Sequence, residues 1–219
     1  MFPSVIQQYQ IMESEIDVII NRSLEIFFRY GIKSVSMDDI SRELGISKKT
    51  LYQYVVDKSD LVQKAMDLKT EQSMRSIDEI MQRGLNAIEE LLEINFMLNQ
   101  LIDKHNPSVD YDLRKYYPEI YQQTIMGRRD RMLKMVRLNL EKGIREGLYR
   151  AGLKTELIAK MYISRVENLH SNESLLSNAV FRELFEYHIR GISNPVGIAY
   201  LEKRLNEIEK SIIENNKTV

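Results

Sequence analysis

Apolar residues recur at helical spacing along almost the whole 219-residue chain, and glycine and proline interrupt them at intervals. The first run covers residues 14–30 and places on one stripe Ile16, Ile20, Leu24, Phe27 and Phe28. Proline in a helix interior costs about 3 kcal/mol, and none occurs between Pro3 and Pro107, which permits long helices there. The sequence contains no alternating run of strand length. The pattern therefore predicts an all-α fold.

Local signals place the expected helix ends. Gly31 and Gly45 end the first two helices, and a break is expected near Gly147. Residues 105–118 are expected to form a polar-aromatic connection. Side chains suited to N-caps precede three of the helices: Ser36, Ser47 and Asp57. The expected helices cover residues 14–30, 37–44, 48–54, 57–82, 85–104, 119–146, 155–170, 174–190 and 198–215.

The most informative stretch is residues 36–58, where two short helices meet through Gly45-Ile46-Ser47, the pattern of a helix-turn-helix. Gly45 accepts the left-handed conformation that ends the first helix, and Ile46 inserts between the helices. Ser47 satisfies the free amides at the start of the second helix, and Leu51 holds that helix against the core. The outward positions are then shared by Lys48, Lys49, Thr50, Tyr52, Gln53 and Tyr54.

That outward set suits duplex DNA. Lysines neutralise phosphates, threonine and glutamine read base edges, and tyrosine hydroxyls donate to phosphate oxygens. Lys58 lies near the start of the next helix, where its ammonium group and the helix dipole can both face the DNA backbone. The net charge of −1 gives no global sign of a polyanion partner, and residues 1–70 hold nine Lys/Arg against ten Asp/Glu. Because only residues 45–58 are locally basic, with three lysines against Asp57, we expect modest non-specific affinity.

From Ile19 to about Met66 the chain resembles the tetracycline-repressor (TetR) family of bacterial transcriptional regulators. The first half of the resemblance lies in Leu24, Phe27-Phe28, Tyr30-Gly31 and Ser34-Val35-Ser36-Met37-Asp38-Asp39-Ile40. The second half lies in Leu44-Gly45-Ile46-Ser47-Lys48-Lys49-Thr50-Leu51-Tyr52-Gln53-Tyr54, Asp57-Lys58 and Leu61. Val55 stands where the family usually has phenylalanine, and Ser41 where alanine is common. Both are packing substitutions, which concern local stability more than function.

The resemblance implies a DNA-facing surface on this turn. The residues assigned to it are Ser36, Ser47, Lys48, Lys49, Thr50, Tyr52, Tyr54 and Lys58. The alternative is that the two adjacent lysines form a solvated face and that Tyr52 and Tyr54 pack between helices. Tyr54 in particular can brace the fourth helix as well as touch a phosphate.

The resemblance also implies the plan of the remaining chain. Residues 12–66 would form the helix-turn-helix DNA-binding domain, and a long helix would join it to a helical ligand-binding and dimerisation domain at residues 67–215. The last two long helices, residues 174–190 and 198–215, would build the homodimer. Their apolar stripes fit that role: Val180, Leu184, Tyr187 and Ile192 in the first, and Ile198, Leu201, Leu205, Ile208 and Ile212 in the second. Packing of both stripes within one chain is the alternative.

A ligand pocket is expected among the central helices. Its candidate lining combines adaptable methionines with aromatic side chains: Phe96, Met97, Leu101, Tyr116, Tyr117, Tyr121, Met126, Met132, Met135 and Tyr162. For any single one of these residues, a place in the ordinary core is an alternative. An anionic ligand would be favoured if Arg131 or Lys134 pointed inward.

Several classes of site are excluded or disfavoured. The chain has no cysteine, and no two of its three histidines lie within four residues of each other, so neither a metal site nor a cofactor is expected. No apolar run is long enough to span a membrane, and the N-terminus lacks the pattern of a secretory signal, so we expect a cytoplasmic protein.

The leading hypothesis is a ligand-responsive regulator of transcription. As a homodimer it would bind a palindromic double-stranded operator, act as a repressor and be released by an unknown small molecule. Phosphate-binding, nucleophile-elbow and zinc-protease motifs do not occur, so we expect no enzyme and assign no catalytic residue. The alternatives are an all-helical enzyme and a ligand-independent interaction module, either of which would use the helix-turn-helix only as a scaffold.

Overall fold

The computed structural model describes residues 14–103, 106–171 and 177–216. Within these stretches the chain forms ten helices and no strand, which confirms the all-α prediction. The helices are α1 (Glu15–Tyr30), α2 (Met37–Leu44), α3 (Lys48–Tyr54), α4 (Lys58–Gln82), α5 (Ala87–Asp103), α6 (Pro107–Tyr116), α7 (Pro118–Arg145), α8 (Thr155–Ser171), α9 (Asn178–Ile192) and α10 (Pro195–Asn216).

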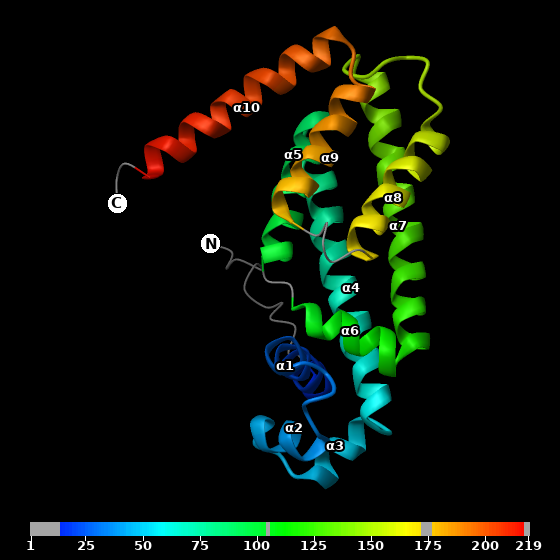
Figure 1. Cartoon of the computed structure of the whole chain (residues 1–219), viewed down its shortest axis with the longest axis vertical. Helices are drawn as coiled ribbons and strands as arrows, with labels where there is room; N and C mark the ends of the chain where they lie inside the picture. The colour runs from blue at the N-terminus through cyan, green and yellow to red at the C-terminus, as the bar shows by residue number, and fades with distance from the viewer. Residues whose placement is uncertain (1–13, 104–105, 172–176, 217–219) are drawn as a thin grey trace, which may run out of the picture. The chain divides into compact units, whose positions relative to one another are not determined.

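The helices divide into two compact units (Figure 1). Unit 1 contains the chain up to Gln72 together with Asn106–Ile125, and unit 2 contains Ser73–His105 and the chain from Met126 onward. Helices α4 and α7 each contribute to both units. Unit 1 is therefore built from two separate stretches of chain, α1 to the first part of α4 and α6 to the start of α7. The proposed boundary at residue 66 is a separate question and stays a prediction.

Unit 1 packs around side chains that its short helices turn inward. Phe27 of α1, Ile40 of α2, Leu51 of α3 and Leu61 of α4 are each completely buried. Because α2 and α3 have only eight and seven residues, this shared core supplies stability that such short helices lack by themselves. The segment that joins from later in the chain adds Val109, Leu113 and Ile120.

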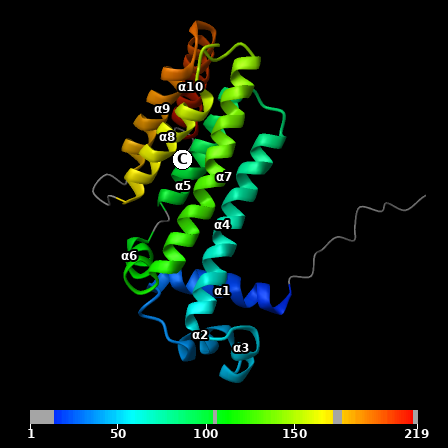
Figure 2. The same cartoon turned by 90° about the vertical axis from the view of Figure 1, so that its right-hand side faces the viewer.

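Unit 2 is a bundle in which α5, α7, α8 and α9 run lengthwise beside one another with the second part of α4 (Figure 2). Its core contains Ile88, Leu140, Ile163 and Ile189, one each from α5, α7, α8 and α9. The first turns of α10 pack on this core through Leu201, whereas the rest of α10 leaves the bundle (Figure 1).

A buried polar network joins α5 to α7 in unit 2. The Glu90 carboxylate is almost fully buried, and Asn139 Nδ2 donates to it at 3.0 Å. Lys142 Nζ pairs with the same carboxylate and also donates to the carbonyl of Leu85. Tyr149 donates its hydroxyl hydrogen to Asn139 Oδ1 at 3.1 Å. Because the buried charge is paired and hydrogen-bonded, the network is a structural element of the bundle.

Three helix boundaries differ from the expected ones. The expected connection at residues 105–118 contains α6, which begins at Pro107 because the Asn106 side chain accepts a hydrogen bond from the amide of Ser108. Helix α9 begins at Asn178, capped by Ser177, and residues 174–176 of the expected helix lie outside the described residues. Helix α10 begins three residues early, at Pro195.

The buried imidazole of His188 makes the stability of the protein depend on pH. Its ring stacks on that of Tyr162 with centroids 4.0 Å apart, and burial lowers its pKa to about 4. In the unfolded chain the pKa is about 6.5, so between these values only the unfolded state binds the proton. The folded state should lose up to about 3 kcal/mol from this group as pH falls from about 6.5 to 4.

Urea unfolding at a series of pH values measures this loss. His188→Phe keeps a stacking ring without a titrating group, so its stability should fall less steeply over this range than that of the unmodified protein. Tyr187→Phe, at the exposed neighbouring position, serves as the control. Equal pH slopes for His188→Phe and the unmodified protein would contradict the assignment.

Two glycines of α7 should respond in opposite directions to replacement by alanine. A Cβ at Gly143 would lie 2.1 Å from Cδ2 of the buried Tyr149 ring, whereas one at Gly127 would meet nothing within 4 Å. Gly143→Ala should therefore lower the free energy of unfolding by about 3 kcal/mol through overpacking. Gly127→Ala should raise it by about 1 kcal/mol because alanine favours helix. Thermal unfolding of both variants tests this prediction. A change of the same sign in the free energy of unfolding of both variants would contradict it.

Candidate nucleic-acid interface

Backbone geometry fixes the angle between α2 and α3. Gly45 has a φ of 68°, in the left-handed region, and its amide donates to the carbonyls of Arg42 and Ser41. The amide of Ile46 donates to the carbonyl of Ser41 at 3.0 Å, and the Ile46 side chain packs against the core of unit 1. The Ser47 hydroxyl then accepts a hydrogen bond from the amide of Thr50 at 3.0 Å. The predicted roles of these three turn residues are confirmed.

Helix α2 begins with a capping box. The Ser36 hydroxyl accepts from the Asp39 amide at 3.2 Å, and the Asp39 carboxylate accepts from the Ser36 amide at 2.9 Å. The hydroxyl of Ser36 also donates to that carboxylate at 2.6 Å. These bonds lower the pKa of Asp39. Ser36 is thus exposed but held in place as the first residue that the turn could offer to a phosphate.

Helix α3 presents one exposed face. Leu51 is buried, while Lys48, Lys49, Tyr52 and Gln53 are exposed. The Tyr52 side chain retains 43% of its accessible surface, so its hydroxyl and ring are both available to a partner. The structure therefore groups two cations, a phenol and an amide on one side of a short, rigid helix.

Two residues of this face already have partners near the turn. Lys48 Nζ lies 2.9 Å from the carboxylate of Asp38, with both side chains more than half exposed, and this carboxylate raises the pKa of Lys48. Thr50 Oγ1 and Ser47 Oγ lie 2.7 Å apart. Exposed pairs of this kind contribute little to stability, so a phosphate can replace Asp38 as the partner of Lys48 at small cost.

Tyr54 and Lys58 are held more firmly within unit 1. The Tyr54 hydroxyl donates to the carboxylate of Glu15 at the start of α1, which raises the pKa of the phenol. Lys58 Nζ donates to the carbonyl of Ile32 at 2.6 Å, and partial burial lowers its pKa. A contact of either residue with DNA stays a prediction.

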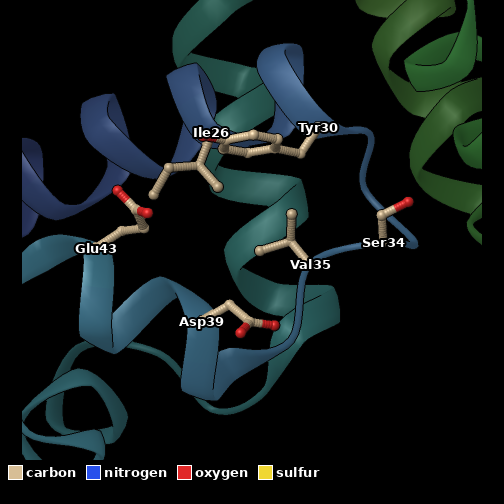
Figure 3. Close-up of a pocket in the computed structure, with 6 residues that line it drawn as sticks. All are labelled: Ile26, Tyr30, Ser34, Val35, Asp39 and Glu43. Atoms are coloured by element: carbon tan, nitrogen blue, oxygen red, sulfur yellow. The ribbon is translucent and has the colours of Figure 1, made fainter.

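A shallow hollow of about 280 Å³ opens between α1 and α2 (Figure 3). Its lining comprises Ile26, Tyr30, Ser34, Val35, Asp39 and Glu43. Figure 3 shows Tyr30 lying along the α1 side and the two carboxylates on α2. Two acidic groups do not favour a phosphate, and Asp39 already caps α2. The hollow is therefore not the DNA-facing surface.

The residues expected to line a ligand pocket are divided between the units. Tyr116, Tyr117 and Tyr121 belong to unit 1, where the latter two pack against its core. Phe96 and Met126 belong to unit 2 but are 68% and 67% exposed. The structure packs the others together in or against the core of unit 2: Met97, Met132, Met135 and Tyr162. The side chain of Leu101 lies outside the described residues. The pocket stays a prediction.

Sequence reasoning missed the polar groups inside unit 2. Among the described residues, Asn95 Nδ2 and His188 Nε2 are buried without a hydrogen-bond partner. Asn95 follows Leu91 by four residues on the buried face of α5, and that position is the signal that could have found it. Arg131 and Lys134 are exposed, and Arg131 lies 3.6 Å from Asp78. The condition for favouring an anionic ligand is therefore not met.

Neither a metal cluster nor a membrane-spanning helix occurs in the described part of the chain. It contains no group of three or more histidine, aspartate or glutamate side chains placed to hold a metal ion. None of its helices is both long and apolar enough to cross a bilayer.

Comparison with known proteins places the turn in a family. Residues 19–65 match the family model described as bacterial regulatory proteins, tetR family. The similarity to this family therefore covers the helix-turn-helix part of the chain. The matched residues comprise most of α1, all of α2 and α3 and the start of α4, which are the elements that position the exposed face.

Individual relatives and solved structures are similar to this chain. An HTH-type transcriptional regulator of Staphylococcus aureus is 29% identical over 107 residues, which cover 44% of this chain and 58% of that protein. A transcriptional regulator from Cytophaga hutchinsonii superposes with a TM-score of 0.71 at 15% identity, covering 81% of this chain and 98% of that one. The regulator FadR from Bacillus subtilis, solved with stearoyl-CoA, gives a TM-score of 0.57 at 23% identity, covering 80% and 97%. The solved structures therefore support the fold across both units.

Proposed function

We propose that this chain is a TetR-family, ligand-responsive transcriptional regulator that binds double-stranded operator DNA as a homodimer. In this proposal it is a repressor, and a small molecule releases it from the operator. The observation that carries the proposal is the face of α3, where a capped helix held by the core of unit 1 exposes Lys48, Lys49, Tyr52 and Gln53. A short rigid helix of this kind fits the major groove of duplex DNA.

Different side chains of that face would contribute affinity and sequence preference. Lys48 and Lys49 would bind phosphates and release counterions, which contributes affinity without sequence preference. Tyr52 and Gln53 offer a hydroxyl and an amide that can reach a phosphate or a base edge. Ser36, Ser47 and Thr50 would donate from their hydroxyls where the backbone passes the turn. The proposed DNA-facing set keeps Tyr54 and Lys58 only as predictions, because Glu15 and Ile32 are their present partners.

Exposed apolar surface on α9 and α10 supports the dimer. Tyr187 of α9 is 79% exposed, whereas Val180 and Leu184 are partly buried against the apolar cluster of Val166, Leu169 and Phe181 in the same chain. On α10, Ile208 is 38% exposed beyond the turns that pack on the bundle. Ile192, by contrast, is buried in the core of its own chain and is not available to a partner. A second copy of the chain would cover the exposed side chains, and two-fold symmetry would pair two α3 helices on a palindrome.

Regulation would act as a shift between two conformations. A ligand that prefers the conformer in which the two α3 helices do not match adjacent major grooves lowers DNA affinity by its preference for that state. Unit 2 is the proposed ligand-binding part, because its core combines Met132 and Tyr162 with the unpaired polar atoms of Asn95 and His188. The stearoyl-CoA bound to the Bacillus subtilis protein indicates that this fold can accommodate a ligand with a long apolar chain. Helix α4, continuous across Gln72–Ser73, connects the two units covalently.

Selection from a random duplex library at two salt concentrations tests the proposal. Retained DNA with a two-fold-symmetric sequence would support both DNA reading and the dimer. A protein that retains no sequence even after refolding free of small molecules would exclude it. Turnover of a substrate without DNA affinity would favour the enzyme alternative.

The selected site allows a sharper variant experiment. Lys48→Ala combined with Tyr52→Phe removes one exposed ion pair and one exposed hydroxyl, so the free energy of unfolding should change by less than about 1 kcal/mol. Affinity for the selected duplex should fall at least about tenfold. Lys154→Ala in unit 2 alters the net charge by the same amount and should leave affinity unchanged. If the double variant unfolds, or binds as tightly as the control, the assignment of this face is wrong.

A further inference from the structure

The loop between α1 and α2 is held from outside by a buried carboxylate. The amide of Lys33 in this loop donates to Asp112 Oδ2 of α6 at 2.8 Å, across 79 positions of sequence. Asp112 is only 7% exposed. A Cβ at Gly31 would lie 3.4 Å from the same oxygen, so the loop backbone and the carboxylate are in close contact. Burial of a carboxylate is unfavourable unless hydrogen bonds compensate, so this bond determines where the loop lies.

A lysine at the start of α4 holds the same loop. Lys58, the first residue of α4, donates from Nζ to the carbonyl of Ile32, the residue next to Lys33. Asp112 and Asp39 both favour its charged form, while burial disfavours it. Consecutive loop residues are thus fixed by a cation from α4 and an anion from α6. We call Asp112, Lys58 and their two backbone bonds the loop latch.

Two further bonds join α6 to the same part of unit 1. Asn106 Nδ2 donates to the carbonyl of Phe28 near the end of α1 at 2.8 Å. Lys33 Nζ donates to the Tyr116 hydroxyl at 2.7 Å and lies 4.4 Å from the centre of its ring. Helix α6 therefore contacts the last turn of α1 and the following loop at several places along its length.

The loop leads directly to the DNA-facing elements. Only Ser34 and Val35 separate Lys33 from Ser36, the N-cap of α2, and α2 carries the turn that orients α3. Charge alone gives Asp112 no favourable role in a unit that binds a polyanion, because a carboxylate repels phosphate. We therefore assign Asp112 a role in position rather than charge: its buried hydrogen bond to the Lys33 amide holds the loop.

Resting on the proposed DNA binding, we propose that Asp112 and Lys58 are positioning residues for the operator. They hold the α1–α2 loop so that Ser36 and α3 meet the DNA in the right place. In this proposal Asp112 does not touch the DNA, and for Lys58 the positioning role replaces the phosphate contact predicted from the sequence. Helix α6 belongs to a stretch of unit 1 whose neighbours along the chain belong to unit 2, so Asp112 lies on a segment that is joined to unit 2 at both ends.

The direction in which an Asp112 substitution changes DNA affinity distinguishes a positioning role from an electrostatic one. Asp112→Ala removes a negative charge, which by Coulomb attraction alone would strengthen binding to DNA. The latch predicts the opposite, a loss of about tenfold in affinity for the selected duplex. Asp112→Asn keeps an oxygen that can accept from the Lys33 amide and should recover most of the loss. Glu119→Gln, at an exposed acid in the same segment, is the control for charge and should not weaken binding. Tighter or unchanged binding by folded Asp112→Ala overturns the proposal.

The salt dependence separates the two roles of Lys58. A lysine bound to a phosphate contributes about 0.9 to the slope of log affinity against log salt, so its loss would reduce the slope by about one per protomer. Lys58→Met should weaken binding with the slope unchanged, whereas Lys49→Ala should reduce the slope. A reduced slope for Lys58→Met would assign Lys58 to the DNA backbone and remove it from the latch.

Hydrogen exchange tests the latch in the full chain without DNA. The Lys33 amide should be protected in the unmodified protein and should exchange at least about tenfold faster in Asp112→Ala, while Asp112→Asn should keep most of the protection. Exchange of this amide at the rate of a free loop in the unmodified protein would refute the latch. Failure of the unmodified protein to bind any duplex would instead refute the proposed function, so the two failures are distinguishable.

Discussion

The whole proposed DNA-facing surface depends on keeping a seven-residue helix folded and correctly oriented. A helix as short as α3 is unstable by itself in water, because so few hydrogen bonds do not offset the cost of starting it. Burial of Leu51 and the hydroxyl cap of Ser47 supply the missing stability. The left-handed Gly45 then sets the angle at which the helix leaves α2. Every exposed side chain of α3 takes its position from these three residues.

The proposed DNA surface is local rather than global. The chain has a net charge of −1, and Asp38 of α2 stands beside Lys48 of α3. In the free protein Asp38 partners Lys48, so the basic face is partly neutralised until a phosphate replaces the carboxylate. This arrangement favours weak non-specific binding, and sequence-specific contacts and a second copy of the chain would have to supply the rest of the affinity.

Sequence predicted the features that depend on neighbouring residues. The cap at Ser36, the left-handed stop at Gly45 and the cap at Ser47 each involve residues within a few positions of one another, and all three are confirmed. The same reasoning failed for α6, because Asn106-Pro107 starts a helix as readily as it makes a turn. Burial of Val109 and Leu113 against unit 1, which the sequence does not display, accompanies the helical outcome.

The hydrogen-bond partners of the candidate site residues could not be predicted from neighbouring residues either, because those partners are distant in the sequence. Lys58 meets Ile32 across 26 positions and Tyr54 meets Glu15 across 39, so their spacing gave no sign that either side chain was already engaged. Asp112 carries no motif at all, and only the fold places it against the loop. The exposed lysines, by contrast, were predictable from helical periodicity once Leu51 was assigned to the core.

The central claim is that two copies of α3, each held by its own unit 1, occupy adjacent major grooves of one operator. Hydroxyl-radical footprinting of the protein on the selected duplex measures this most directly. The account predicts two symmetric protected blocks on one face of the DNA, with centres about 10 base pairs, one helical turn, or a whole number of turns apart. A single protected block, or protection without two-fold symmetry, would contradict it.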